Sequence, residues 1–286
     1  MLRYKEIFIG SQCNNKCLYC PVCHKDVPQP DFNSLLDSLK KRDGDNVVLY
    51  GGEPTLNKDL FAIIDAAKKN GYRRIKLITN GRAFSDAQLL YRVIAAGGSL
   101  FEIKLWGSHP PLHDHLTRTA GSFQETVRGL ENLAGFPEDK FVCIRIPVCK
   151  ENYTDLGNTV ATALGFGVNR IILSFEDHAL SLQSALPYIR NAINISIFNR
   201  TWILTEGVPF CLMAGLEHHI GEMYQGLTTI YERTFQKHRY CTGCIYKELC
   251  SGVDAAYIKQ FGDAEFAPVT TNKHFQDMRN LNASNP

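Results

Sequence analysis

Short, mostly apolar runs alternate with longer amphipathic runs from the N-terminus to residue 175. The short runs are rich in Val, Ile and Phe, which predicts strands. In the longer runs apolar residues recur every three or four positions, which predicts helices. The predicted strands cover residues 4–10, 46–50, 73–79, 100–106, 141–148 and 169–175. The predicted helices cover residues 31–41, 57–71, 89–98, 126–135 and 152–167.

This alternation of strands and helices favours a parallel sheet with right-handed crossovers. Six strand–helix units predict an α/β fold that forms a partial (β/α)6 TIM-like barrel. Functional loops in such folds follow the carboxyl ends of the strands. The segments 11–20, 51–54 and 79–82 each follow a predicted strand directly, so we expect them to meet at one rim of the barrel.

The pattern changes after residue 200, where "RTWILTEGVPFCLM" predicts a strand or hairpin and the later helices are short. We therefore divide the chain into a barrel domain, residues 1–200, and a small cysteine-rich C-terminal domain, residues 201–286.

Composition narrows the class of protein. The chain has 286 residues, 44% of them hydrophobic, and 31 basic against 29 acidic side chains give a net charge of +2. A balance so close to neutral provides no electrostatic footprint for nucleic acid or an anionic membrane. No apolar run approaches the length of a spanning helix, and the N-terminus lacks the features of a signal peptide, so a cytoplasmic location is expected.

Eight of the ten cysteines form two groups, and only Cys143 and Cys149 fall between them, so a dispersed disulfide framework is not indicated. Cytosolic thiols stay reduced, so two groups at opposite ends of the chain indicate two inorganic sites. The front group contains Cys13, Cys17, Cys20 and Cys23, and the rear group contains Cys211, Cys241, Cys244 and Cys250.

The front group supports two interpretations. Three thiolates in one short loop, Cys13, Cys17 and Cys20, can hold three irons of a 4Fe–4S cube and leave the fourth iron free. Alternatively, Cys23 or His24 completes a tetrahedral zinc site.

Several motifs of residues 1–200 together resemble the radical S-adenosylmethionine (radical SAM) superfamily. The segment "CNNKCLYC" (13–20) resembles the cluster-binding signature, and "GGEP" (51–54) resembles the glycine-rich motif of that family. The resemblance continues through "ITNGR" (78–82), "GSHPPLHDHLTRTAGSFQETVRGLENL" (107–133) and "IPVCKEN" (146–152).

The resemblance implies that Cys13, Cys17 and Cys20 ligate a 4Fe–4S cluster and that SAM fills its open iron site. Tyr19 then contacts the adenine, Gly51 and Gly52 allow a close backbone approach, and Glu53 accepts from the ammonium of SAM. Asn80 belongs to the implied SAM site. The family often has a serine on the fourth strand, and Lys104 occupies that position here. Arg145 is a candidate partner for the SAM carboxylate, or alternatively an outward-facing, solvated arginine.

The implied reaction is reductive cleavage of SAM to a 5′-deoxyadenosyl radical, which removes a hydrogen atom from a substrate. It implies an electron donor such as a flavodoxin or ferredoxin.

The rear cysteines resemble part of the auxiliary-cluster region called SPASM, or its short form, twitch. Cys211, Cys241, Cys244 and Cys250 then bind a second, auxiliary 4Fe–4S cluster. A structural zinc site is the alternative, and if Cys211 stays free the cluster keeps an open iron.

For the other candidate cysteines and histidines, a purely structural role is the alternative to a functional one. His109, His113 and His115 have the spacing of a metal-binding run, but this loop in the family commonly contains a His–Asp pair without metal. Cys23, Cys143 and Cys149 are candidate hydrogen-atom donors, for which packing is the alternative.

The resemblance leaves two substrate classes open. Ribosomally made peptides are the first expectation, with a crosslink, an epimer or an oxidised group as the product. Only twelve residues precede Cys13, so a peptide is expected to bind directly or through a separate recognition protein. A small metabolite such as a sugar or aminocyclitol is the alternative. A protein of another class, an iron–sulfur electron carrier or a zinc-binding interaction protein, is a further alternative. The glycine-rich motif argues against it, because such a protein needs no SAM pocket.

Overall fold

The computed structural model describes residues 4–20, 22, 27–136, 140–175, 177, 179–224 and 235–271. Its main sheet has seven strands that pair in sequence order, β1 to β7, and every pairing is parallel. The strands are β1 (Tyr4–Phe8), β2 (Asn46–Tyr50), β3 (Arg74–Thr79), β4 (Gly98–Lys104), β5 (Phe141–Val148), β6 (Arg170–Phe175) and β7 (Trp202–Glu206). The parallel α/β architecture is therefore confirmed.

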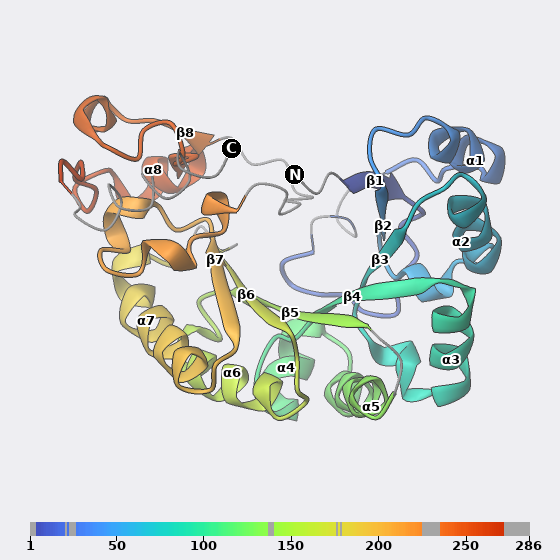
Figure 1. Cartoon of the computed structure of the whole chain (residues 1–286). Coiled ribbons are helices and arrows are strands. Elements are labelled where there is room, and N and C mark those ends of the chain that lie inside the picture. The colour runs from blue at the N-terminus through green and yellow to red at the C-terminus, as the bar shows by residue number, and fades with distance from the viewer. Residues whose placement is uncertain are drawn as a thin grey trace.

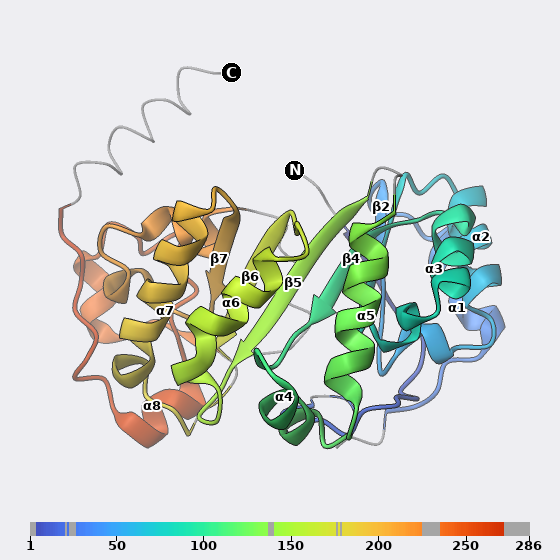
Figure 2. The same ribbon diagram turned by 90° about the horizontal axis from the view of Figure 1, so that it is seen from below.

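Helices cover the outer face of the curved sheet, and the sheet remains open between β1 and β7 (Figures 1 and 2). They are α1 (Phe32–Lys40), α2 (Leu60–Lys69), α3 (Ala87–Ala96), α4 (Pro110–Thr117), α5 (Ser122–Ala134), α6 (Leu156–Leu164) and α7 (Leu182–Phe198). This arrangement is a partial barrel, with a concave face that can hold a ligand.

Side chains along each strand point alternately to the helix-covered core and to the concave face of the sheet. On β5, Val142, Ile144 and Ile146 are buried in the core against the helices. Side chains of a strand point alternately to its two faces, so Cys143 and Arg145 lie on the concave face.

Three elements of the barrel were not predicted as such. Helices α4 and α7 were missed, and β7 extends the sheet from the six strands predicted to seven. Because β7 pairs with β6, the barrel sheet continues to Glu206, beyond the boundary predicted at residue 200. The division into two domains stays a prediction.

The segment after β7 contains short elements only. A 3-10 turn (Phe210–Leu212) carries Cys211, and a second one (Arg239–Gly243) carries Cys241. The antiparallel pair β8 (Phe235–Gln236) and β9 (Val253–Asp254) precedes α8 (Ala255–Phe261), which lies beside the β7 edge of the barrel (Figure 1). No helix among the described segments has both the length and the apolar composition needed to cross a membrane.

Candidate active site

The loops predicted to meet at one rim do so around a single pocket of about 530 Å³. Cys13, Cys17 and Cys20 line it from the loop after β1, which we call the cysteine loop (residues 11–20). The other walls come from the ends of the next three strands: Gly51, Gly52, Asn80 and Lys104. Residues far apart in the sequence thus form one cavity at the carboxyl ends of β1 to β4.

Gly51 and Gly52 do more than leave space for a ligand. Their backbone packs directly against the backbone at the start of the cysteine loop. The Gly52 amide donates to Gly10 O at 2.8 Å, and the Glu53 amide donates to Gln12 O at 2.7 Å. A Cβ atom on Gly51, whose φ is +153°, would lie 2.1 Å from Gly10 O. On Gly52 it would lie 2.3 Å from Gln12 O. Only glycine permits this backbone contact.

Glu53 is buried at the junction between this loop and the end of β3. Its Oε1 accepts from the Thr55 amide at 3.1 Å and from the Thr79 hydroxyl at 2.7 Å, and its Oε2 accepts from the Asn80 amide at 2.7 Å. Burial raises the pKa of this carboxyl, against the lowering effect of those hydrogen bonds. The predicted contact of Glu53 with the SAM ammonium stays a prediction.

Asn80 and Arg82 hold the cysteine loop from the β3 side. The Asn80 side-chain amide donates to Asn14 Oδ1 at 2.7 Å and lies 4.0 Å from Cys13 Sγ. Arg82 donates to Asn14 O at 2.5 Å and to Asn15 Oδ1 at 2.7 Å. These contacts fix the backbone immediately after the first cysteine.

The end of α4 holds the other half of the loop. The Lys16 and Leu18 amides donate to Thr117 O and Leu116 O, both at 2.9 Å. Earlier in α4, His113 Nδ1 accepts from the Trp106 amide at 3.2 Å, and His109 Nδ1 caps the helix by accepting from the Leu112 amide. Both histidines therefore accept hydrogen bonds from backbone amides through Nδ1. The alternative of a loop without metal stays a prediction.

His113 gives the protein a measurable pH dependence. Burial lowers the pKa of this imidazole from 6.5 to about 4, so the folded chain keeps it neutral. The unfolded chain binds its proton at higher pH, so His113 destabilises the fold as pH falls from 6.5 towards 4. Urea unfolding of wild type should lose about 3 kcal/mol more between pH 7 and pH 4 than that of His113→Asn. Equal losses in the two proteins would contradict this assignment.

Tyr19 connects the cysteine loop to the ends of β5 and β6. Its hydroxyl lies 2.9 Å from Glu151 Oε2 and 3.1 Å from Asp177 Oδ2, and its ring stacks on Trp106. Burial and the nearby carboxylates raise the pKa of Tyr19 far above its usual value, so it stays a neutral donor. Its predicted contact with adenine stays a prediction.

Lys104 and Arg145, the two cationic residues of the predicted SAM site, lie in different places. Lys104 lines the pocket. Arg145 is buried within the concave face, where its Nε donates to Glu102 at 2.5 Å and its Nη1 donates to Glu206 at 2.6 Å. The alternative of an outward, solvated Arg145 is therefore wrong.

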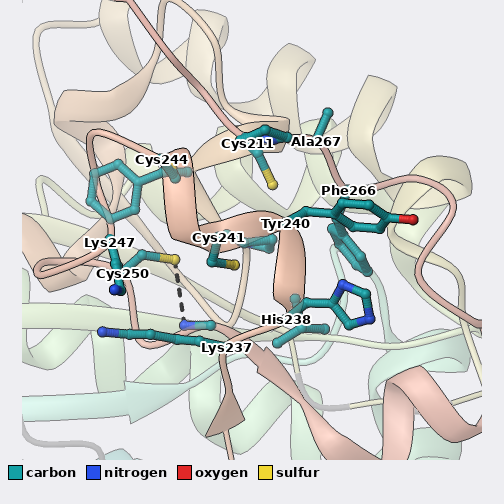
Figure 3. Close-up of a pocket in the computed structure, with 15 residues that line it drawn as sticks. Cys211, Lys237, His238, Tyr240, Cys241, Cys244, Lys247, Cys250, Phe266 and Ala267 are labelled. Atoms are coloured by element: carbon teal, nitrogen blue, oxygen red, sulfur yellow. Dashed lines mark hydrogen bonds between the residues drawn. The ribbon is translucent and has the colours of Figure 1, made fainter.

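The four rear cysteines, Cys211, Cys241, Cys244 and Cys250, line a second pocket of about 510 Å³. Sulfur atoms of three of them are visible within the same small space in Figure 3. Burial, together with the nearby Cys250 and Cys244 thiols, raises the pKa of Cys211 to about 11. The sequence-distant Cys211 is thus brought to the other three.

In the part of the chain that the structure describes, neither the front set nor the rear set of cysteines converges on the position of a single metal ion. Among the described residues, no three Cys, His, Asp or Glu side chains converge closely enough to hold one metal ion. Cys23 and His24, the proposed fourth zinc ligands, lie outside the described residues. Of the other candidate thiols, Cys143 is buried on the concave face, and Cys149 is buried with Trp106 and Leu116 against Cys17.

The motifs did not identify every residue that shapes the site. Arg82 stood in the quoted motif "NGR" without an assigned role, and Trp106 and Asp177 received none. The contacts of these side chains join loops that are distant in sequence, so no local periodicity signals them.

Comparisons with known proteins agree with this geometry. A family model described as the radical SAM superfamily matches residues 7–163. The mycofactocin maturase MftC of Mycolicibacterium smegmatis is 28% identical over 162 residues, which are 54% of this chain and 40% of that protein. The Fe-coproporphyrin III synthase of Methanosarcina barkeri is 28% identical over 151 residues, 51% of this chain and 37% of that one.

One solved structure matches over nearly the whole chain. Native anSMEcpe with bound AdoMet and the Kp18Cys peptide superposes with a TM-score of 0.64 at 14% identity, covering 99% of both chains. This likeness concerns the fold. This chain spans about two fifths of the length of the two curated relatives, at 40% and 37%. The family model covers more than half of the chain, and the chain therefore belongs to the radical SAM superfamily.

Proposed function

We propose that this protein is an enzyme that binds a 4Fe–4S cluster through Cys13, Cys17 and Cys20 and binds SAM in the adjoining pocket. The observation that carries the proposal is the single cavity that unites the three thiols with Gly51, Gly52, Asn80 and Lys104. Family membership supports it, since the matched residues 7–163 contain all of these side chains.

The donor chemistry fits a cluster. Thiolates on a tetrahedral zinc ion stand about 3.8 Å apart, as Zn–S distances of about 2.3 Å require. In a 4Fe–4S cube each thiolate binds a different iron, so its ligands are spread around a larger body. Thiols that line one pocket without converging on a point are in keeping with the larger occupant.

When bound, the cluster and SAM supply the 5′-deoxyadenosyl radical that abstracts a hydrogen atom from the substrate. The chain positions these groups and limits side reactions. Hydrogen bonds from the loop after β2, from the end of β3 and from the end of α4 hold the backbone of the cysteine loop. The apolar cluster of Trp106, Leu116 and Cys149 packs against Cys17 and shields that side of the site from water.

Lys104 is the better placed of the two cations to hold the SAM carboxylate, because Arg145 is engaged by two glutamates and does not line the pocket. Lys104→Met should raise the Kd for SAM about tenfold, equivalent to roughly 1.4 kcal/mol. Equilibrium dialysis of labelled SAM against cluster-loaded protein measures this. Lys150→Met, an exposed lysine after β5, is the control and should leave the Kd unchanged.

We further propose that the rear cysteines hold an auxiliary 4Fe–4S cluster, as in SPASM or twitch regions. The support is that all four line one pocket although Cys211 is 30 residues from Cys241. A structural zinc site remains the competing proposal. Iron analysis separates them: about eight irons per chain supports two clusters, and about four with zinc supports the alternative.

The proposed substrate is a ribosomally made peptide. The similarity to a protein named as a maturase and the fold shared with anSMEcpe, solved with a bound peptide, favour this class. The similarity to a protein named Fe-coproporphyrin III synthase supports the second candidate, a small metabolite. A flavodoxin or ferredoxin electron donor, a separate peptide-recognition protein and a cytoplasmic location remain part of the proposal.

The decisive test of activity is anaerobic incubation of the reconstituted protein with SAM and dithionite. We expect 5′-deoxyadenosine, detected by chromatography, at a level at least a hundredfold above that of the Cys17→Ala variant, because the uncatalysed reaction is negligible. Wild-type protein that contains its iron but forms no 5′-deoxyadenosine would defeat the proposal.

A further inference from the structure

One side chain of the rear pocket has a role that its hydrogen bonds do not explain. His238 lines the pocket together with the four cysteines (Figure 3). Its Nε2 lies 2.6 Å from Asp263 Oδ2. Its Nδ1 is shielded from solvent and has no hydrogen-bond partner among the described residues. Burying a polar atom without a hydrogen-bond partner costs free energy of folding. A group bound in the pocket would give Nδ1 a partner.

The contact with Asp263 determines what Nδ1 can offer. A carboxylate accepts, so Nε2 carries the proton and donates it to Asp263. In the neutral ring Nδ1 then has a lone pair and can bind a metal. Histidines that bind metals usually donate the opposite ring nitrogen to a carboxylate or carbonyl, which fixes the tautomer and the ring. His238 and Asp263 have this arrangement.

His238 lies close in sequence to three of the cysteines and lines the same pocket. The order is His238-x2-Cys241-x2-Cys244-x5-Cys250, within one stretch of thirteen residues. Strands β8 and β9 pair on either side of this stretch and close it into a loop. At the base of the loop, Gly252 packs so closely that a Cβ would lie 2.3 Å from Gln236 O. The loop therefore carries four candidate donors by itself, and Cys211 approaches from the barrel side.

We propose that His238 Nδ1 is a metal ligand of the auxiliary site and completes a four-donor set with Cys241, Cys244 and Cys250. His238 then takes the place that the ligand set proposed above gives to Cys211, and Cys211 lies beside the site as a fifth donor. This inference rests on the auxiliary cluster proposed above. A mixed cysteine and histidine set is chemically reasonable, since histidine replaces cysteine on iron in some iron–sulfur centres.

The test uses the full-length chain with Cys13, Cys17 and Cys20 changed to alanine, so that only the auxiliary site binds iron. The protein is labelled with 15N-histidine, reconstituted, reduced, and examined by electron–nuclear double resonance. We expect a 15N coupling of the size of a directly bound imidazole. It should disappear in His238→Gln and persist in His115→Gln, which removes an exposed histidine of α4.

A second measurement does not depend on the spectrum. Iron release to a chelator should be at least tenfold faster from His238→Gln than from the parent protein, and unchanged in the control His115→Gln. Iron that is bound without a histidine coupling, or is lost in Cys211→Ala but retained in His238→Gln, overturns the inference and leaves the auxiliary cluster standing. Absence of iron from the parent protein overturns both.

Discussion

Gly52→Ala is expected to abolish iron incorporation at the front cysteine site while leaving the barrel folded. The new Cβ would lie 2.3 Å from Gln12 O and 2.4 Å from Ser11 O. Both are backbone atoms of the cysteine loop, so the loop itself must move. The 2.7 Å hydrogen bond from the Glu53 amide to Gln12 O would be lost with it. We expect about four fewer irons per chain than wild type and no detectable SAM binding.

Iron and sulfide analysis after anaerobic reconstitution, with circular dichroism for the fold, provides the measurement. Gly135→Ala is the matched control. This glycine ends α5 at a φ of −74°, and a Cβ there would meet Glu131 O at an ordinary contact distance of 3.5 Å. Normal iron content in Gly52→Ala would show that the glycine loop does not set the position of the thiols.

Arg145→Met is expected to destabilise the fold by roughly 3–5 kcal/mol, the usual cost of removing one partner of a buried ion pair. Arg145 has only 4% of its side chain exposed and joins β4 to β7 through Glu102 and Glu206. Methionine would fill part of the space but leave Glu206 without this cationic partner, whereas Glu102 would keep its ion pair with Lys76. Urea unfolding at pH 7 measures the loss.

The ion pair of Arg145 with Glu102 also predicts how the free energy of unfolding changes at acid pH. Burial alone would raise the pKa of Glu102, but the charges of Arg145 and Lys76 hold it well below its usual value of 4.5. Its stabilising contribution is therefore complete above pH 4.5 and is lost as pH falls below that value. Arg145→Met should reduce this acid-side loss.

An exposed ion pair supplies the control for Arg145. Lys69 and Asp65 of α2 are 2.6 Å apart, with 75% and 58% of their side chains exposed. Lys69→Met should change the free energy of unfolding by less than about 1 kcal/mol, because water screens such pairs. A loss in Arg145→Met no larger than that of the control would mean that the buried network does not stabilise the barrel.

The sequence predicted most of the barrel because the strands up to β6 and the helices α1, α2, α3, α5 and α6 have clear periodicity. Helix α4 was missed because it is only eight residues long and begins with two prolines. Helix α7 was missed because Pro187 interrupts a pattern that contains few charges. Strand β7 was left as a strand or hairpin, since its place in the sheet depends on pairing with β6, which no local pattern reveals.

The site shows the same division between local and distant information. The cysteine and glycine motifs predicted which loops form the pocket, because short spacings carry that chemistry. They did not predict that Gly52 and Arg82 hold the cysteine loop itself, or that Glu53 accepts hydrogen bonds from Thr55, Thr79 and Asn80. The burial of Arg145 between two glutamates likewise depends on three strands meeting in space.

The most direct measurement of the central claim asks what binds the fourth iron of the front cluster. Cys241→Ala/Cys244→Ala/Cys250→Ala protein, with only the front site loaded, is reduced and mixed with SAM labelled with 17O in its carboxylate and 15N in its amino group. Electron–nuclear double resonance should then show both nuclei coupled to the cluster, which means that one iron is open to SAM. Coupling from a fourth protein side chain, with none from labelled SAM, would contradict the account.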